Sequence, residues 1–166
     1  MPISIDDVKA LRERTQAGVM DCRQALEEAG DDLDKATTIL RQKGLATAGK
    51  RADREANQGL VEAYIHSGRI GAMVEVNCET DFVARTDLFK TLAHDLAMQV
   101  ASMAPEVIDP KDLAADAAGS PEQLALLAQP FIKDQSKSIQ DLINETITST
   151  GEKIEVQRMV RYTLGE

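Results

Sequence analysis

The sequence predicts an α+β fold in which a small N-terminal bundle of three helices precedes a three-stranded antiparallel sheet covered by helices. Residues 4–43 carry apolar side chains at helical spacing, whereas residues 60–78 alternate apolar and polar side chains with the period of two that strands require. A second alternating stretch, residues 153–164, comes only after two further helical segments. Strands grouped in this way favour an antiparallel sheet over a parallel one.

Three short helices account for residues 4–43. Ser4 is the expected N-cap of the first helix, and Gly18 marks the break before the second. Gly30 ends the second helix, and we expect the third helix to close at Gly44. A bundle of about 40 residues is near the lower size limit for independent folding, so we expect it to depend on a neighbour or a partner.

A polar linker and a β-hairpin follow the bundle. Residues 46–58 are poor in large apolar side chains, which is typical of a solvated helical linker. Residues 60–66 and 70–78 form the two expected strands of the hairpin. Residues 87–103 then carry an apolar stripe at helical spacing, ended by Pro105, and this helix is the natural cover for the hairpin.

The C-terminal part begins with irregular chain. Residues 105–130 are acidic and rich in proline, so we expect loops there with one short helix near residues 124–127. Ser138 caps the next helix, Gly151 breaks it, and residues 153–164 form the last strand. The side chains expected together on one face of that strand are those of Ile154, Val156, Val160 and Tyr162.

The elements divide the chain into three parts: a helical domain at residues 1–45, a linker at 46–58 and an α+β core domain at 59–166. A sheet of only three strands leaves free edges that invite pairing with a second chain. The core domain is therefore the expected site of any dimer contact.

Length and charge limit the classes of function. The formal net charge of -9 repels phosphate backbones and no basic block compensates for it, so we expect no direct contact with nucleic acid. No apolar run approaches the roughly 18 residues of a membrane span, and the first residues are acidic where a targeting signal would be basic. We therefore expect a cytoplasmic protein that binds no membrane.

Catalytic and cofactor sites are weakly supported. Cys78, His94 and Asp95 could be combined into a thiol triad, and Glu79 with Asp81 into an acid/base pair. However, Cys78 falls on the apolar face of its strand, and no glycine-rich turn offers an oxyanion hole. The spacing of cysteines and histidines matches no zinc site, and no phosphate-binding glycine motif occurs. We expect no enzyme activity, no bound metal and no cofactor.

The junction between the hairpin and the following helix is the most informative segment. It places Thr80, Asp81, Phe82 and Val83 at a corner of the fold, in a chain with only 3% aromatic residues. On pattern alone, the favoured interpretation is a helix start in which Thr80 or Asp81 is the cap and Phe82 packs back on Phe89. The alternative is an exposed aromatic side chain that contacts a partner.

Several stretches of the sequence resemble the elongation factor Ts family of guanine nucleotide exchange factors. The longest is residues 76–85, which read Val-Asn-Cys-Glu-Thr-Asp-Phe-Val-Ala-Arg, and residues 15–22 and 50–56 also match. The resemblance covers nearly the whole chain and implies that the N-terminal bundle resembles a ubiquitin-associated domain. It also implies that the chain binds elongation factor Tu, both GDP-bound and nucleotide-free, and promotes GDP release.

The resemblance assigns roles to particular residues. Thr80, Asp81, Phe82 and Val83 correspond to the family's segment that intrudes near the magnesium ion of the Tu protein, with Asp81 and Phe82 as the wedge. This implication reverses the preference for a Phe82 packed on Phe89. In the bundle, the expected partner contacts are Arg12, Val19 and Met20, although for Met20 a core role is equally compatible with the sequence.

The chain also departs from longer members of the family. It has one sheet subdomain where they have two, and its segment at residues 105–130 looks shorter even than in compact members. A homodimer through the core sheet could replace the missing half, and a functional monomer is the alternative. A second function class stays open as well: an adaptor of the ubiquitin-associated type that binds a partner without nucleotide exchange.

Overall fold

The computed structural model describes residues 3–166, and these divide into two compact units. Unit 1 comprises the described residues up to Arg54 together with Asn144–Lys153, and unit 2 comprises Glu55–Ile143 with Ile154–Glu166. The predicted α+β class is confirmed, with N-terminal helices followed by a three-stranded antiparallel sheet and its covering helix. Each unit is built from local signals that the sequence carries.

Unit 1 is built on three helices, α1 (Ile5–Thr15), α2 (Val19–Ala29) and α3 (Leu33–Arg51). Two of them begin at a side-chain cap: the Ser4 hydroxyl accepts a hydrogen bond from Asp6 N at 3.2 Å, and Asp32 accepts from the start of α3, whereas α2 begins at Gly18 without such a bond. Small and apolar side chains then pack between the helices. The buried core consists of Leu11, Ala17, Cys22, Ala25, Leu26, Ala36 and Leu40.

The expected end of the third helix at Gly44 is wrong, because α3 continues to Arg51. Gly44 is buried, and a Cβ atom there would lie 3.3 Å from the hydroxyl oxygen of Thr148. The glycine therefore permits a close approach by the C-terminal half of α7 (Ile139–Thr150), which belongs to unit 1. Ser149 Oγ also donates to the carbonyl oxygen of Gln16 at 2.5 Å, so this half-helix packs on the bundle as a fourth element.

The predicted linker at residues 46–58 thus begins inside a helix. Arg51, in the last turn of α3, donates from Nη1 to the carbonyl oxygen of Ile147 at 3.2 Å, and Lys153 Nζ donates to that of Arg54 at 3.0 Å. The first of these cations adds a second hydrogen bond to the Ile147 carbonyl oxygen, which also accepts from Gly151 N at 2.9 Å. The functional domain boundaries at residues 45 and 58 stay a prediction.

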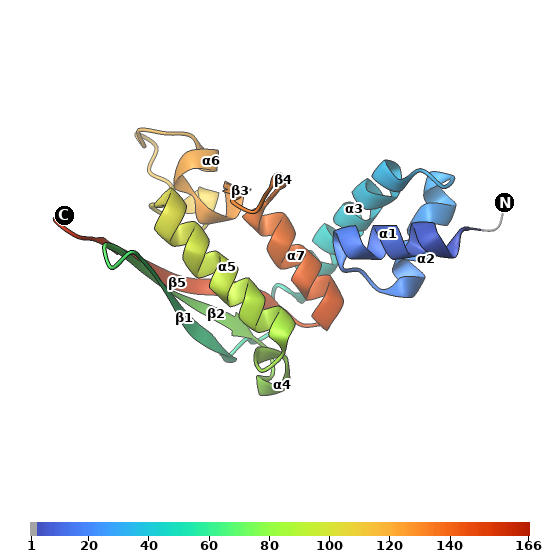
Figure 1. Ribbon diagram of the computed structural model, residues 1–166, viewed down its shortest axis with the longest axis horizontal. Helices are drawn as coiled ribbons and strands as arrows, with labels where there is room; N and C mark the ends of the chain where they lie inside the picture. The colour runs from blue at the N-terminus through green and yellow to red at the C-terminus, as the bar shows by residue number, and fades with distance from the viewer. Residues whose placement is uncertain (1–2) are drawn as a thin grey trace. The chain divides into compact units, whose positions relative to one another are not determined.

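Unit 2 contains the three-stranded sheet, in the order β1 (Gln58–His66), β2 (Ile70–Cys78) and β5 (Ile154–Thr163), with all neighbours antiparallel. The long helix α5 (Asp87–Met103) lies across one face of it (Figure 1). Phe89, Leu96 and Val100 of α5 are buried, as are alternate side chains of β2. The predicted hairpin and covering helix are confirmed.

A β-bulge changes the face of the last strand. Glu75 is paired with Arg158 but its neighbour Val76 is paired with Val156, so Gln157 is an extra residue in β5. Because one additional residue reverses the alternation, Val160 and Tyr162 lie on the opposite face from Ile154 and Val156. The prediction that these four side chains share one face is therefore wrong.

The segment between α5 and β5 holds more structure than the sequence predicts. Its short elements are η1 (Pro110–Asp112), α6 (Pro121–Leu124), η2 (Leu126–Ala128), β3 (Pro130–Phe131) and β4 (Asp134–Ser138). Where one short helix near residues 124–127 was expected, the chain forms two short helical turns, α6 and η2, and the ribbon of β3 and β4 was not predicted. The buried Gln99 amide holds this ribbon on α5 by accepting from Ile132 N at 2.9 Å and donating to Pro130 O at 3.0 Å.

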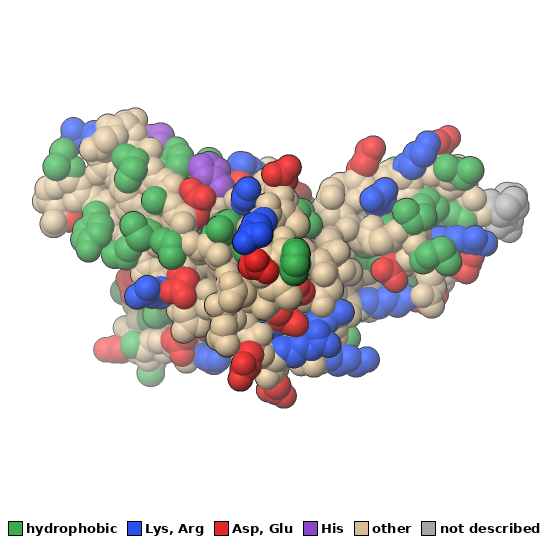
Figure 2. Space-filling model, turned by 90° about the horizontal axis from the view of Figure 1, so that it is seen from below, with side chains coloured by type: hydrophobic (Ala, Val, Ile, Leu, Met, Phe, Trp, Pro, Cys, Tyr) green, Lys and Arg blue, Asp and Glu red, His purple; other side chains and the backbone are tan. Residues whose placement is uncertain are grey.

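The face of the sheet opposite α5 carries large apolar side chains in contact with solvent. They are Val61, Ile65, Met73, Val160 and Tyr162. Figure 2, seen from below Figure 1, shows hydrophobic side chains gathered over the sheet. We call these five residues, together with Glu75 and Arg158 on the same face, the open face. None of the helices in the described part of the chain is both long and apolar enough to cross a membrane.

Candidate partner-binding site

The candidate site is the turn that connects β2 to α5. At the end of β2, the buried Cys78 thiol donates from Sγ to the carbonyl oxygen of Thr80 at 3.2 Å. Thr80 has an extended backbone, and its hydroxyl accepts from Val83 N at 3.4 Å. These contacts start the one-turn helix α4 (Asp81–Ala84), which Figure 1 shows at one end of the sheet. The predicted cap at Thr80 is confirmed.

The side chains of this turn differ in burial: some face the rest of unit 2, and others face solvent. Ala84 is buried and Val83 is half-buried, so the turn is fixed to its own unit through these side chains. Phe82 projects outward with 78% of its surface exposed, while Phe89 is completely buried. The interpretation that Phe82 packs back on Phe89 is therefore wrong. An aromatic side chain this exposed, on a turn whose backbone is capped, is available to a partner.

Asp81 lies beside Phe82 and is oriented by a cation one turn later. Its Oδ2 atom is 3.0 Å from Nη2 of Arg85, and the Arg85 backbone N–H donates to the Asp81 carbonyl oxygen at 3.2 Å. An exposed pair at this spacing contributes only about 0.3–0.5 kcal/mol, so it orients the carboxylate without locking it. Sequence reasoning missed Arg85, although its spacing of four residues from Asp81 was a visible signal.

A second exposed surface lies at the start of α2 in unit 1. Gly18 is the N-cap of this helix, and Val19 and Met20 in its first turn are 52% and 72% exposed. The core role left open for Met20 is therefore wrong, because the core-facing side of α2 is supplied by Cys22 instead. Arg12 is likewise exposed, on α1.

An apolar groove adjoins this surface within unit 1. Its volume is about 350 Å³, and it is lined by Ile3, Ile5, Val8, Val19 and Arg23. Arg23 is paired with Glu27 at 3.2 Å, so one edge of the groove is polar. The sequence analysis identified Val19 alone among these residues. Ile5 and Val8 carry the missed signal, a spacing of three residues on one side of α1.

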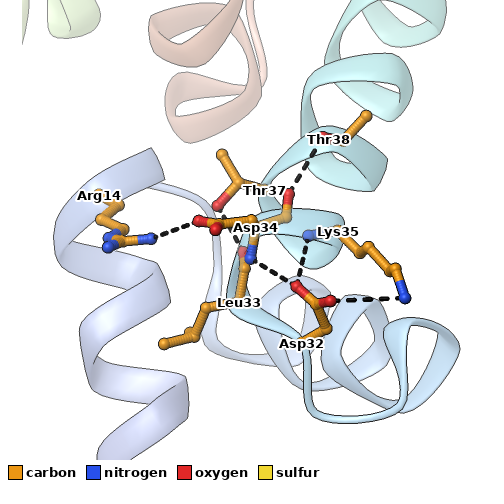
Figure 3. Close-up of polar contacts among 7 residues, drawn as sticks. All are labelled: Arg14, Asp32, Leu33, Asp34, Lys35, Thr37 and Thr38. Atoms are coloured by element: carbon orange, nitrogen blue, oxygen red, sulfur yellow. Dashed lines mark hydrogen bonds and ion pairs between the residues drawn. The ribbon is translucent and has the colours of Figure 1, made fainter.

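The start of α3 is fixed by a network of charges, drawn in Figure 3. Asp32 Oδ1 accepts from the backbone N–H groups of Asp34 and Lys35, each at 3.0 Å. The hydrogen bond from Lys35 N is the largest cause that holds the pKa of Asp32 below its usual value. Arg14 on α1 pairs with Asp34 at 3.2 Å, which ties the two helices together on the exposed side of the bundle.

The residues considered for thiol catalysis contact other groups instead of one another. The Cys78 thiol donates to Thr80, His94 Nδ1 is 3.8 Å from Glu62 Oε1, and Asp95 is paired with Lys133. Burial is the main cause that raises the pKa of the other thiol, Cys22, which makes it a poor nucleophile. Among residues 3–166, no group of three His, Cys, Asp or Glu side chains is placed to hold a metal ion.

Comparisons with known proteins agree on one family. A family model described as elongation factor TS matches residues 46–122. The chain is 50% identical to elongation factor Ts of Moorella thermoacetica, over 99% of this chain and 96% of the relative. It is 47% identical to elongation factor Ts of Coprothermobacter proteolyticus over 100% of both chains, and 45% identical to that of Thermotoga maritima over 100% of this chain and 98% of the relative.

These alignments also show a difference in length. The alignment with the Coprothermobacter proteolyticus relative extends over 197 positions, whereas this chain has 166 residues. That relative therefore carries segments without a counterpart here.

Proposed function

This chain belongs to the elongation factor Ts family and is a translation elongation factor, and on that premise we propose that it promotes the release of GDP from elongation factor Tu. It binds the partner in its GDP-bound and nucleotide-free forms and leaves it ready to take up GTP. It acts in the cytoplasm, without direct contact with nucleic acid or membrane. The observation that carries this proposal is the exposure of Phe82 beside Asp81 on a capped turn.

The exchange itself requires no chemistry by this chain. If the factor lowers the affinity of the partner for GDP by some ratio, GDP must lower the affinity for the factor by the same ratio. A thousandfold loss of GDP affinity needs about 4 kcal/mol of coupling. Asp81 and Phe82 enter the partner near its magnesium ion and displace the ion, which weakens the hold on the GDP phosphates.

One side chain is too small to supply that coupling. Burial of a phenylalanine contributes about 1.5–3 kcal/mol, so Phe82 must work together with anchoring contacts elsewhere. The exposed surface of Arg12, Val19 and Met20 on unit 1, with the apolar groove beside it, is the proposed anchor. Thr80 and Val83 hold the wedge: Thr80 caps α4, and Val83 packs toward its own unit.

The test follows labelled GDP as it leaves purified elongation factor Tu after this chain is added. It is run once with excess Mg²⁺ and once with the ion removed by a chelator. We expect a large acceleration with Mg²⁺ and a much smaller one without it, because the ion is then already displaced. Equal acceleration in both conditions would contradict displacement of the ion, and no acceleration in either would contradict exchange.

A second candidate function is favoured by the apolar groove on unit 1, which could hold a helix or peptide without any exchange. In that case the chain is an adaptor of the ubiquitin-associated type. The same experiment separates the two functions, since an adaptor binds elongation factor Tu, or another protein, and leaves the rate of GDP release unchanged.

The open face supports a homodimer. Strands of nine or ten residues in a three-stranded sheet cover about 30 Å by about 14 Å, an area at the small end of specific interfaces. Large apolar side chains exposed over such an area mark a contact surface, and Tyr162 is 75% exposed there. We expect a dimer that dissociates in the micromolar range. Sedimentation over a range of concentrations tests it, and a monomer at every concentration would refute it.

A further inference from the structure

The open face carries one pair of opposite charges. Glu75 lies on the open face of the central strand β2, and Arg158 lies directly opposite it on β5. Arg158 Nε is 2.6 Å from Glu75 Oε2. The bulge at Gln157 produces this pairing, because it turns Arg158 to the open face and places it level with Glu75. The pair therefore lies at one end of the apolar side chains of the open face, level with Val61.

The two partners of this pair differ in burial. The Glu75 side chain is 25% exposed, whereas that of Arg158 is 79% exposed. A hollow of about 270 Å³ adjoins them, lined in part by Val61, Met73 and Val160. Arg158 uses Nε for Glu75 and, within residues 3–166, its remaining guanidinium N–H groups meet no other acceptor. These N–H groups are therefore available to an acceptor on another chain.

From this arrangement we propose that Glu75 and Arg158 fix the register and the specificity of the contact between two copies of this chain. The inference rests on the homodimer proposed above and goes beyond it. In a two-fold interface the same surface meets itself, so Arg158 of each copy can pair with Glu75 of the other. The interface between two copies then contains two carboxylates and two guanidinium groups, and their charges sum to zero.

These four charged groups make the contact specific, because an arrangement of two chains that does not pair them is energetically unfavourable. A buried charge is tolerated when it is paired and hydrogen-bonded, whereas one left unpaired is strongly unfavourable. Against another apolar surface, or the same surface in a shifted register, Glu75 and Arg158 of one chain would still pair with each other, but the remaining N–H groups of Arg158 would be buried without an acceptor. The surrounding apolar residues then provide attraction, and the charged pair decides which arrangement of the two copies is accepted.

Charge reversal tests the proposal. The variants are Glu75→Arg, Arg158→Glu and the double exchange of both, with Lys43→Glu as a control that breaks a comparably exposed ion pair with Glu28 in unit 1. Folding of each variant is checked by circular dichroism and urea unfolding. Sedimentation gives the dimer dissociation constant, and native mass spectrometry of mixed, mass-labelled variants gives the fraction of heterodimer.

Each single reversal should weaken the homodimer by about 10- to 100-fold, while the control and the double exchange stay within about threefold of the original chain. An equimolar mixture of the two single variants should form heterodimers in preference to either homodimer, because their charges are complementary only between copies. Folded single variants that dimerise normally, or a mixture without heterodimer, would overturn the inference while leaving the dimer intact. An original chain that is always monomeric would overturn the dimer and the inference together, without affecting the exchange function.

Discussion

Replacement of Phe82 by alanine is the sharpest test of the wedge. The side chain is 78% exposed in the free protein, so its removal should change the free energy of unfolding by no more than about 0.5 kcal/mol. Full burial of a phenylalanine contributes about 1.5–3 kcal/mol. About three-quarters of that gain, roughly 1–2.5 kcal/mol, is still available when the free protein docks on its partner.

If this gain is used to displace the ion, its loss raises the barrier to GDP release by the same amount. Since each 1.36 kcal/mol corresponds to a factor of ten, Phe82→Ala should slow release by about 5- to 60-fold at saturating factor. Stopped-flow fluorescence of labelled GDP measures this rate. Affinity for nucleotide-free elongation factor Tu, measured separately, should decrease less than the release rate, because the anchor on unit 1 is untouched.

Two further variants make the result interpretable. Met103→Ala removes a 41% exposed apolar side chain at the opposite end of α5 and should leave release unchanged. Phe82→Leu keeps most of the apolar surface and should give an intermediate rate. A Phe82→Ala protein that is folded, binds its partner and releases GDP at the original rate would refute the reasoning.

Three other predictions concern the stability and reactivity of the free protein. Gly59→Ala should destabilise unit 2 by at least about 1–3 kcal/mol in urea unfolding, because its φ of +148° is strained for alanine and the new Cβ would collide with the backbone of β2. Gly49→Ala is its control: this glycine lies in open space on α3, so the change should stabilise unit 1 by about 0.5–1 kcal/mol. For Asp32, the hydrogen bond from Lys35 N holds the pKa of the folded state below 3.8, so its stabilising effect is full above that pH and disappears as the pH falls below it. Urea unfolding of Asp32→Ala and the original chain should therefore converge in acid. Burial raises the pKa of the Cys22 thiol, so alkylation at pH 8 should modify Cys22 only as fast as unit 1 opens, and rapid labelling of the folded protein would contradict this.

Much of the fold could be predicted because its signals are local. The hairpin and α5 were predicted within two residues, since alternation with a period of two and a stripe at helical spacing follow from the strand and helix geometry alone. A cap at Thr80 or Asp81 was predicted for the same reason, because a side-chain oxygen two or three residues before an unpaired backbone N–H acts within one turn, and the structure assigns it to Thr80.

The position of Phe82 could not be obtained from pattern alone. An apolar residue beside a helix start is compatible with packing on the next turn and with exposure, and only the 78% exposure of Phe82 in the folded chain decides between them. The role of Gly44 could not be predicted from the sequence pattern either. A glycine late in a helix predicts an end, but here α7 approaches so closely that a Cβ atom at residue 44 would lie only 3.3 Å from the Thr148 hydroxyl oxygen.

The sequence by itself determined the order and kind of the main elements, the position of the capped turn, the scarcity of large apolar side chains in residues 46–58 and the acidic character of residues 105–130. Only the tertiary structure decided which side chains of β5 reach the open face. The extra residue at Gln157 reverses every side chain after it, and a bulge forms only where a partner strand imposes its register. No alternation within β5 reveals that register, so Arg158, Val160 and Tyr162 could be assigned to the open face only once β2 was beside them.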